Sequence, residues 1–246
     1  MQERIRLPEG IDRLENSVFE ILRRWAKSED YLFFESYWDK FKAKGKDLTC
    51  EHVARTLIIS TNTALSTGTV NPRAMVYSAF LHDVGKLDDR IPEGLLNLKR
   101  PPTPEELELI RMHSRWGYDQ LISQGHYFSA LSALLHHKFT KGYPNILPSP
   151  ILPVEIGEKT RIAGEHCARL VSLCDCFEAA RYRENCFASG YPKRLGEREV
   201  KDVLLRENAD LASLIVKLSS EGIFDIGIPI SEVDINYTHE KSNPPL

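Results

Sequence analysis

Seven side chains of the sequence have types that suit metal binding, and they are five histidines and two aspartates. They are His52, His82, Asp83, His113, His136, His137 and Asp175. Imidazole and carboxylate groups suit Mn, Fe or Zn. Seven ligands exceed the roughly four of one tetrahedral ion. We therefore expect two divalent ions that share Asp83 and a bridging water. Metals about 3.5–4 Å apart can generate hydroxide and stabilise an in-line displacement at phosphorus.

The pair His82-Asp83 must be positioned by the helix that precedes it. Pro72 suits a first helical position, and apolar residues from Met75 to Phe80 recur at helical spacing. Gly85 is expected to turn left-handed and end this helix. The pair then lies on the last turn, behind an apolar face. Taken alone, a capping Asp beside a chance His explains it equally well.

His52 and His113 are expected on two further helices. A helix capped by Thr49 and running to about Ser66 carries His52 close to its apolar positions, where a lone histidine is more often an ordinary core residue. Thr103-Pro104-Glu105-Glu106 forms a capping box that starts the helix of His113. Gly117, one turn later, would leave room for a close neighbour.

His136-His137 closes an apolar helix that Ser129 is expected to cap. Asp175 follows a long apolar run on a helix that begins at about Thr160. A buried carboxylate is costly unless it is paired or binds metal. The alternative to metal binding at Asp175 is a salt bridge to Arg169, Arg181 or Arg183. Prolines between residues 139 and 153 predict an irregular loop.

The remaining pattern is also helical. Helices are expected over residues 11–27, 30–43, 197–207 and 209–220, with a loop at 42–46 and an irregular tail after Ile228. The aromatic segment 31–41 is expected to pack on the main bundle, although it could be an interaction surface. His126, His166 and His239 lie in no motif and are not expected to be ligands.

Composition limits the class of protein. The chain has 246 residues, 42% of them hydrophobic and 27% charged, which is ordinary for a globular protein. A net charge of −3 gives no basic field for polymeric nucleic acid. The first residues do not form a signal peptide, and no run of residues is long and apolar enough to span a membrane. Five cysteines without a CxxC pair indicate a reducing, cytoplasmic setting.

In this order the motifs resemble the HD-GYP phosphodiesterases, a branch of the HD-domain superfamily. The resemblance extends from about Cys50 to Ala180 and includes His52, His82-Asp83-Val84-Gly85-Lys86, His113 with Gly117, His136-His137, Gly142-Tyr143-Pro144, and Asp175 with Phe177 and Ala179. It implies an all-α HD-domain helical bundle with an irregular GYP loop. It also implies hydrolysis of cyclic di-GMP by a centre of two or three Fe or Mn ions.

The resemblance implies roles for single residues. All seven candidate ligands match metal ligands, with Asp83 bridging. Lys86 matches a lysine near the scissile phosphate, where it would bind substrate and assist catalysis. Gly142, Tyr143 and Pro144 match the loop on the substrate side.

The sequence also departs from the family. Lys138 replaces the usual glutamate after the two histidines, and the usual Asp-Gly before the GYP loop is missing. Leu48 stands where three-metal members have a glutamate, so two metals are favoured. The usual arginine-rich stretch is out of register, so the residue that meets phosphate among Arg181, Arg183, Lys193 and Arg194 stays open.

We therefore predict a cytoplasmic, metal-dependent phosphodiesterase that hydrolyses a cyclic dinucleotide, most simply cyclic di-GMP. Its binuclear centre would hold Fe or Mn, with Zn as an option, and a bridging hydroxide. Residues 1–47 would form N-terminal helices packed on the bundle, 48–228 the catalytic domain and 229–246 a tail. A homodimer or a signalling partner is possible. The alternatives are an HD-type phosphohydrolase for another nucleotide, a catalytically silent cyclic-dinucleotide receptor, and a scaffold acting through residues 31–41.

Overall fold

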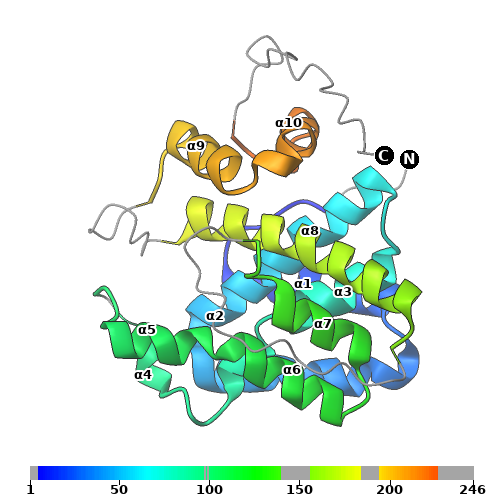
Figure 1. The fold of residues 1–246 in the computed structure, drawn as a ribbon, viewed down its shortest axis with the longest axis vertical. Helices are drawn as coiled ribbons and strands as arrows, with labels where there is room; N and C mark the ends of the chain where they lie inside the picture. Colours follow the sequence, from blue (N-terminus) through cyan, green and yellow to red (C-terminus); the bar gives the residue numbers. More distant parts are fainter. Residues whose placement is uncertain (1–4, 97, 99, 140–155, 184–193, 227–246) are drawn as a thin grey trace, which may run out of the picture.

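Helices are the only regular elements among the residues that the computed structural model describes, which are 5–96, 98, 100–139, 156–183 and 194–226, without the side chains of 45–47. The all-α prediction is confirmed. Figure 1 shows the arrangement. The helices are α1 (Ile11–Trp25), η1 (Ser28–Asp30), α2 (Tyr31–Thr67), α3 (Pro72–Leu81), η2 (Val84–Leu87), α4 (Glu93–Leu96), α5 (Pro104–Arg111), α6 (His113–Ser123), α7 (Tyr127–Leu135), α8 (Glu158–Tyr182), α9 (Glu197–Glu207), η4 (Ala209–Leu211) and α10 (Ala212–Ser220).

Helix α2 is the longest element and packs against α1, α3, α8 and η2. The loop predicted at residues 42–46 is wrong, because α2 continues through it, and Thr49 therefore caps nothing. A glycine inside a helix costs only roughly 0.5–1 kcal/mol relative to alanine. Phe41 and Cys50, which lie on either side of Gly45 along the helix, are both buried. The free energy gained by burying these side chains offsets the cost of the glycine. The predicted domain boundary after residue 47 lies within this helix, and the division into domains stays a prediction.

The aromatic segment at the start of α2 packs inward, as predicted. Phe34, Trp38 and Phe41 are fully buried against Phe80 of α3, with ring centroids 5.0, 6.5 and 6.1 Å from the Phe80 ring. Leu32 is the exception and is exposed. This contact fixes α3, and therefore the end of α3 that carries His82, against α2.

Helix α3 begins at Pro72, as predicted, but it ends at Leu81. The prediction that His82 and Asp83 lie on its last turn and that Gly85 ends it is therefore wrong. Asn71 caps the helix by accepting hydrogen bonds from the backbone amides of Arg73 and Ala74. Gly85 lies inside η2, and it does not have a positive φ. A Cβ atom on Gly85 would lie 1.8 Å from the carbonyl oxygen of His113 and 2.5 Å from the amide of Gly117. Gly85 is therefore a site of close backbone approach, and Gly117 is the small neighbour that the sequence predicts.

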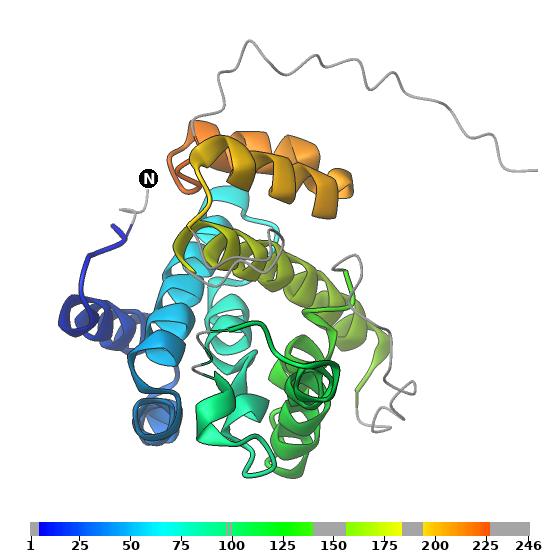
Figure 2. The same cartoon turned by 90° about the vertical axis from the view of Figure 1, so that its left-hand side faces the viewer.

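The helices on the other side of the site differ modestly from expectation. The capping box of Thr103 and Glu106 is confirmed, but the helix breaks at Met112, so His113 starts α6. Helix α7 starts two residues before the predicted Ser129 cap. Helices α9 and α10 lie across the outer side of α8 (Figure 2). No helix in the described ranges is long and apolar enough to cross a membrane.

The close crossing of η2 and α6 makes a testable prediction. Gly85→Ala should destabilise the fold by roughly 3 kcal/mol, because overpacking here displaces backbone rather than a flexible side chain. Gly94→Ala is the matched control, because a Cβ atom there meets nothing within 4 Å. Denaturant unfolding measures both variants. Equal stability of the two would contradict the proposed contact.

Candidate metal centre

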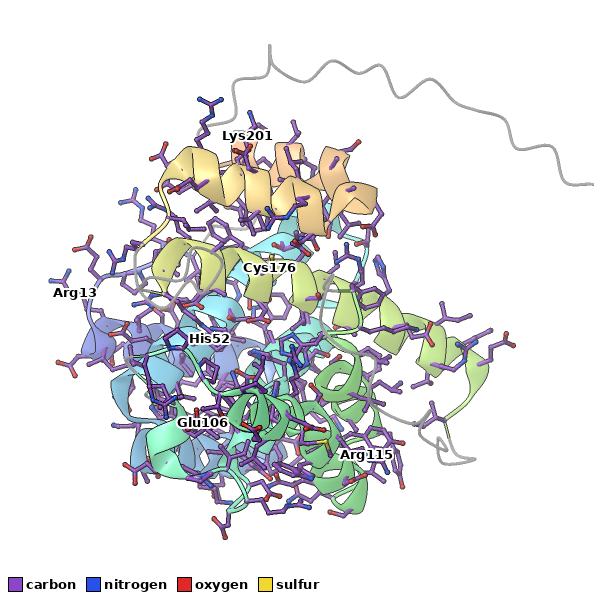
Figure 3. All side chains as sticks on the ribbon, turned by 60° about the vertical axis from the view of Figure 1, so that its left-hand side comes forward. Arg13, His52, Glu106, Arg115, Cys176 and Lys201 are labelled. Carbon is purple, nitrogen blue, oxygen red and sulfur yellow. The ribbon has the colours of Figure 1, made fainter. Side chains whose placement is uncertain are left out.

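The seven predicted ligands come from separate helices and meet in the interior of the bundle. His52 lies on α2, His82 and Asp83 follow α3, and His113 starts α6. His136 and His137 follow α7, and Asp175 lies on α8. Figure 3 shows His52 inside the bundle, whereas Lys201 on α9 points outward. Six of the seven residues are buried, and the side chain of His137 is 18% exposed.

Asp83 lies at the centre of this group, with one carboxylate oxygen facing each of two histidine pairs. Oδ2 lies 3.1 Å from Nε2 of His52 and 3.4 Å from Nε2 of His82. Oδ1 lies 3.2 Å from Nε2 of His113 and 3.8 Å from Nε2 of His136. A carboxylate in this position can accept one cation at each oxygen.

Backbone carbonyls at helix ends fix the orientation of three of these rings. Nδ1 of His82 donates to the Ala79 carbonyl at 2.7 Å, and Nδ1 of His136 donates to the Ala133 carbonyl at 2.8 Å. Nδ1 of His113 donates in the same way to the carbonyl of residue 110 at 2.6 Å. A carbonyl can only accept, so each Nδ1 carries the hydrogen and a neutral ring has its lone pair on Nε2. The last carbonyls of a helix lack helical partners and are free for this role.

The lone pairs of His113 and His136 face one another. Their Nε2 atoms are 3.2 Å apart, and Nε2 of His52 and His82 are also 3.2 Å apart. Two nitrogens bound at about 2.1 Å to one ion are about 3.0–3.4 Å apart for octahedral or tetrahedral angles. Oδ1 of Asp83 is buried and accepts no hydrogen bond within the described part of the chain. Lone pairs that face one another at this distance repel, and a cation between these nitrogen and oxygen atoms would turn the repulsion into attraction.

Three overlapping groups of ligand atoms are compact enough to hold a metal ion, each with its atoms within 4.8 Å of one another. They are His52 with His82 and Asp83, His113 with His136 and His137, and His82 with His136 and Asp175. Together they include every predicted ligand. Nitrogen and carboxylate donors without thiolate suit Mn, Fe or Zn. The residues present therefore fit divalent ions.

The protonation states also suit metal binding. Burial lowers the pKa of His136 to about 3, helped by the neighbouring His82 and His113. Burial likewise holds the pKa of His137 well below its usual value. Burial would raise the pKa of Asp83, but the Lys86 ammonium and His82 outweigh it and keep the carboxyl ionised. Burial also lowers the pKa of His82, but at His52 the effect of burial is outweighed by Glu178 and Asp83, which raise its pKa. The centre thus contains three imidazoles, those of His82, His136 and His137, that are held neutral near an ionised carboxylate.

Lys86 lies beside this centre. It is the third residue of η2, and its Nζ donates to Oδ2 of Asp83. The Lys86 side chain is 13% exposed, so its ammonium lies between the buried carboxylate and the edge of the site. Lys86 therefore lies next to the candidate metal ligands, and its place near a scissile phosphate stays a prediction.

Sequence reasoning missed Glu178, which holds the fourth ring. Glu178 is fully buried on α8, and its Oε2 accepts a hydrogen bond from Nδ1 of His52 at 2.5 Å. Arg55 donates to Oε1 at 3.3 Å, and Nε of Arg183 lies 3.6 Å from Oε2. Glu178 follows Asp175 by three residues, so both lie on one face of α8. That spacing, with a second acid in an apolar run, was the available signal.

The alternative prediction for Asp175, a salt bridge to an arginine, finds only a long contact in the structure. Arg183 lies 3.9 Å from its Oδ1, whereas Nε2 of His52 lies 3.2 Å from the same oxygen. Arg169 instead pairs with Asp210 and Asn208, and Arg181 pairs with Asp225.

Other predicted positions are not part of the centre or cannot be placed. Gly142, Tyr143 and Pro144 of the GYP loop, Lys193 and His239 lie outside the described residues. His126 stacks on Phe33 with centroids 4.4 Å apart, and His166 is exposed. Leu48, expected in place of a third-metal ligand, is exposed.

The chain is similar in sequence to a response regulator that is named as a phosphodiesterase. It is 30% identical over 164 residues to the cyclic di-GMP phosphodiesterase response regulator RpfG of Xanthomonas campestris pv. campestris (strain 8004). The alignment covers 60% of this chain, and the chain spans 40% of the length of that relative. No family model matches the sequence.

The Glu178 contact predicts a change in metal affinity. Glu178→Gln should weaken metal binding by about 10–100-fold, the usual effect of removing a carboxylate that orients a ligating histidine. Glu165→Gln is the control, because Glu165 pairs with Arg161 on the surface of the same helix. Chelator competition measures the affinity of each. Unchanged affinity in a folded Glu178→Gln variant would show that Glu178 does not orient His52.

The buried neutral His136 predicts a pH dependence of stability. Its folded pKa is about 3 and its unfolded pKa is about 6.5, so the unfolded chain binds the proton more readily. In the metal-free protein, the contribution of neutral His136 to the free energy of unfolding should be complete above pH 6.5 and should be lost as the pH falls toward 3. His136→Gln should flatten that part of the curve of unfolding free energy against pH. An unchanged slope in the variant would contradict burial of a neutral ring.

Proposed function

We propose that this protein is a metal-dependent phosphodiesterase that hydrolyses a cyclic dinucleotide. The single observation that carries the proposal is the position of Asp83, whose two oxygens face two separate pairs of imidazole nitrogens at 3.1–3.8 Å. This arrangement suits a carboxylate shared by two ions. The proposed ligands are His52, His82, Asp83, His113, His136, His137 and Asp175, and the proposed ions are Fe or Mn, with Zn as an option.

When bound, two such ions supply a hydroxide at neutral pH and offset charge on the phosphoryl oxygens. The chain's own residues provide the rest. Asp83 stays ionised and lies between the two ligand groups, and His136 stays neutral because it is buried. Glu178 keeps Nε2 of His52 directed inward. The side chains that surround the reacting phosphate are thus oriented before substrate arrives, which lowers the cost of reaching the transition state.

Lys86 is the proposed catalytic cation. Its ammonium is held at Asp83, next to the place where a phosphodiester coordinated by the centre would lie. An ammonium there can offset the charge that develops on phosphorus oxygens or give a proton to the departing ribose oxygen. Lys86 thus has two proposed roles, in substrate binding and in catalysis.

Cyclic di-GMP is the proposed substrate. The support is the similarity to RpfG, a protein named as a cyclic di-GMP phosphodiesterase, together with the ordered motifs that end in Gly142-Tyr143-Pro144. Lys138 is exposed directly after the histidine pair, where the resemblance leads one to expect a glutamate. This difference leaves open a related nucleotide, so the substrate test must include others.

The test combines metal analysis with turnover. Protein loaded with Mn or Fe should contain about two ions per chain and should convert cyclic di-GMP to the linear dinucleotide. Chromatography of the products measures this conversion. Asp83→Asn and His82→Ala should lose both metal and at least about 99% of the rate, because they remove ligands rather than residues that merely orient them. His166→Ala is the matched control and should behave as wild type, since His166 is exposed and outside the centre.

The outcomes separate the alternatives. Turnover of cyclic GMP-AMP or of deoxynucleoside monophosphates, but not of cyclic di-GMP, would replace the substrate and keep the hydrolase. Tight nucleotide binding with little metal and no turnover would identify a receptor and overturn the proposal. A protein that neither retains nor takes up metal would overturn it as well.

A further inference from the structure

Lys44 makes a set of contacts that neither the motifs nor the proposed chemistry uses. It lies on α2, two turns before His52, and its Nζ donates to the carbonyl of Leu87 at 2.9 Å and to that of Asp88 at 2.5 Å. Nζ also lies 3.5 Å from Oδ1 of Asp89. The side chain is only 18% exposed. Leu87 is the last residue of η2, the turn that carries Lys86, and Asp88 and Asp89 follow it directly.

The same turn is held on its other side by backbone packing and by an arginine. Gly85 lies directly against the backbone of α6. Arg90 forms two hydrogen bonds of 2.7 Å with Asp88 and lies over the Trp116 ring, 4.1 Å from its centroid. Lys44 therefore makes a polar contact that joins the residues at the end of η2 to α2, whereas Gly85 and Arg90 join this segment to α6.

The chemistry of Lys44 suits this task. The Leu87 carbonyl lies at the end of a helical turn and carries partial negative charge. The Asp88 carbonyl also accepts from the Ile91 amide at 3.0 Å, and its second lone pair can accept from the ammonium. An ammonium has three donors and no acceptor, so it can satisfy two carbonyls and one carboxylate at once. Lys42, two residues earlier on α2, shows the contrast, because it makes an exposed pair with Glu15.

We propose that Lys44 is a positioning residue that holds η2 against α2 and thereby sets Lys86 against Asp83. Lys86 precedes Leu87 directly, so a shift of the Leu87 carbonyl moves the Lys86 backbone with it. Helix α2 carries both Lys44 and His52, eight residues or about 12 Å apart along the helix axis. One rigid element would then fix the distance between the first ligand and the turn of the lysine. The catalytic consequence rests on the proposed function, but the positioning itself does not.

The experiment compares Lys44→Met with Lys42→Met in the full chain, and adds Lys44→Arg as the conservative variant. Methionine keeps most of the stem and removes the charge. Two measurements test the positioning: the reactivity of the Lys86 amine toward a trace acylating reagent, and amide hydrogen exchange over residues 84–91. The values of kcat and KM and the metal content are measured alongside them.

We expect Lys44→Met to speed hydrogen exchange over residues 84–91 by roughly tenfold, a factor typical of losing one hydrogen-bonding group. The reactivity of Lys86 should change, and kcat should fall by about tenfold with metal content unchanged. Lys44→Arg should restore most of each quantity, and Lys42→Met should match wild type. A merely destabilised protein would melt earlier without a selective change at Lys86.

If hydrogen exchange and Lys86 reactivity in Lys44→Met both equal the wild-type values, the proposal is overturned, whatever the activity of the variant. A wild-type protein without phosphodiesterase activity would instead remove the proposed function. The exchange and labelling measurements would still decide the role of Lys44 in that case.

Discussion

A buried carboxylate surrounded by imidazole lone pairs is the constraint on which the rest of the structure depends. Asp83 is 1% exposed and lies within 4 Å of four Nε2 atoms. Three of the four rings have Nδ1 committed to a carbonyl three residues earlier. Such a group of acceptors is unfavourable when it is closed on itself and favourable around cations. Favourable interactions elsewhere in the fold must therefore compensate for the cost of holding these side chains together.

The compensating free energy comes from helix packing around the centre. The aromatic residues of α2 fix α3 through Phe80, and the two glycines allow η2 and α6 to approach at backbone distance. Helix ends matter for the site, because His82, His113 and His136 each stand next to a helix end and donate to a carbonyl of its last turn. The ends of α3, α5 and α7 are thus part of the site.

Much of this arrangement could be predicted from the sequence, because it depends on residue type and helical spacing. The capping box at Thr103 and the small neighbour at Gly117 follow from local patterns. The seven residues proposed as ligands follow from residue type and from the order of the motifs, and the structure brings them together. The errors have one cause in common: long-range contacts. From the sequence alone, Gly45 is typical of a loop, and only the packing of the helix on both sides of it shows otherwise. Gly85 is likewise typical of a helix end, and only the position of α6 shows that it is a site of close backbone approach. Glu178 and Lys44 act across 126 and 43 residues, which no spacing rule reaches.

The distribution of charge explains why such a centre would suit a phosphodiester. The imidazoles lie inside, where burial keeps those of His82, His136 and His137 neutral. The cations Lys86, Arg55 and Arg183 lie nearer the edge and pair with Asp83, Glu178 and Asp175. These pairs roughly balance the acids before any ion is bound. Two divalent ions would then leave a positive excess in a site of low dielectric, where charge acts strongly. A phosphodiester brings the compensating negative charge, and its transition state brings more. The same residues that make the centre unfavourable without cations would in this way make it selective for an anion.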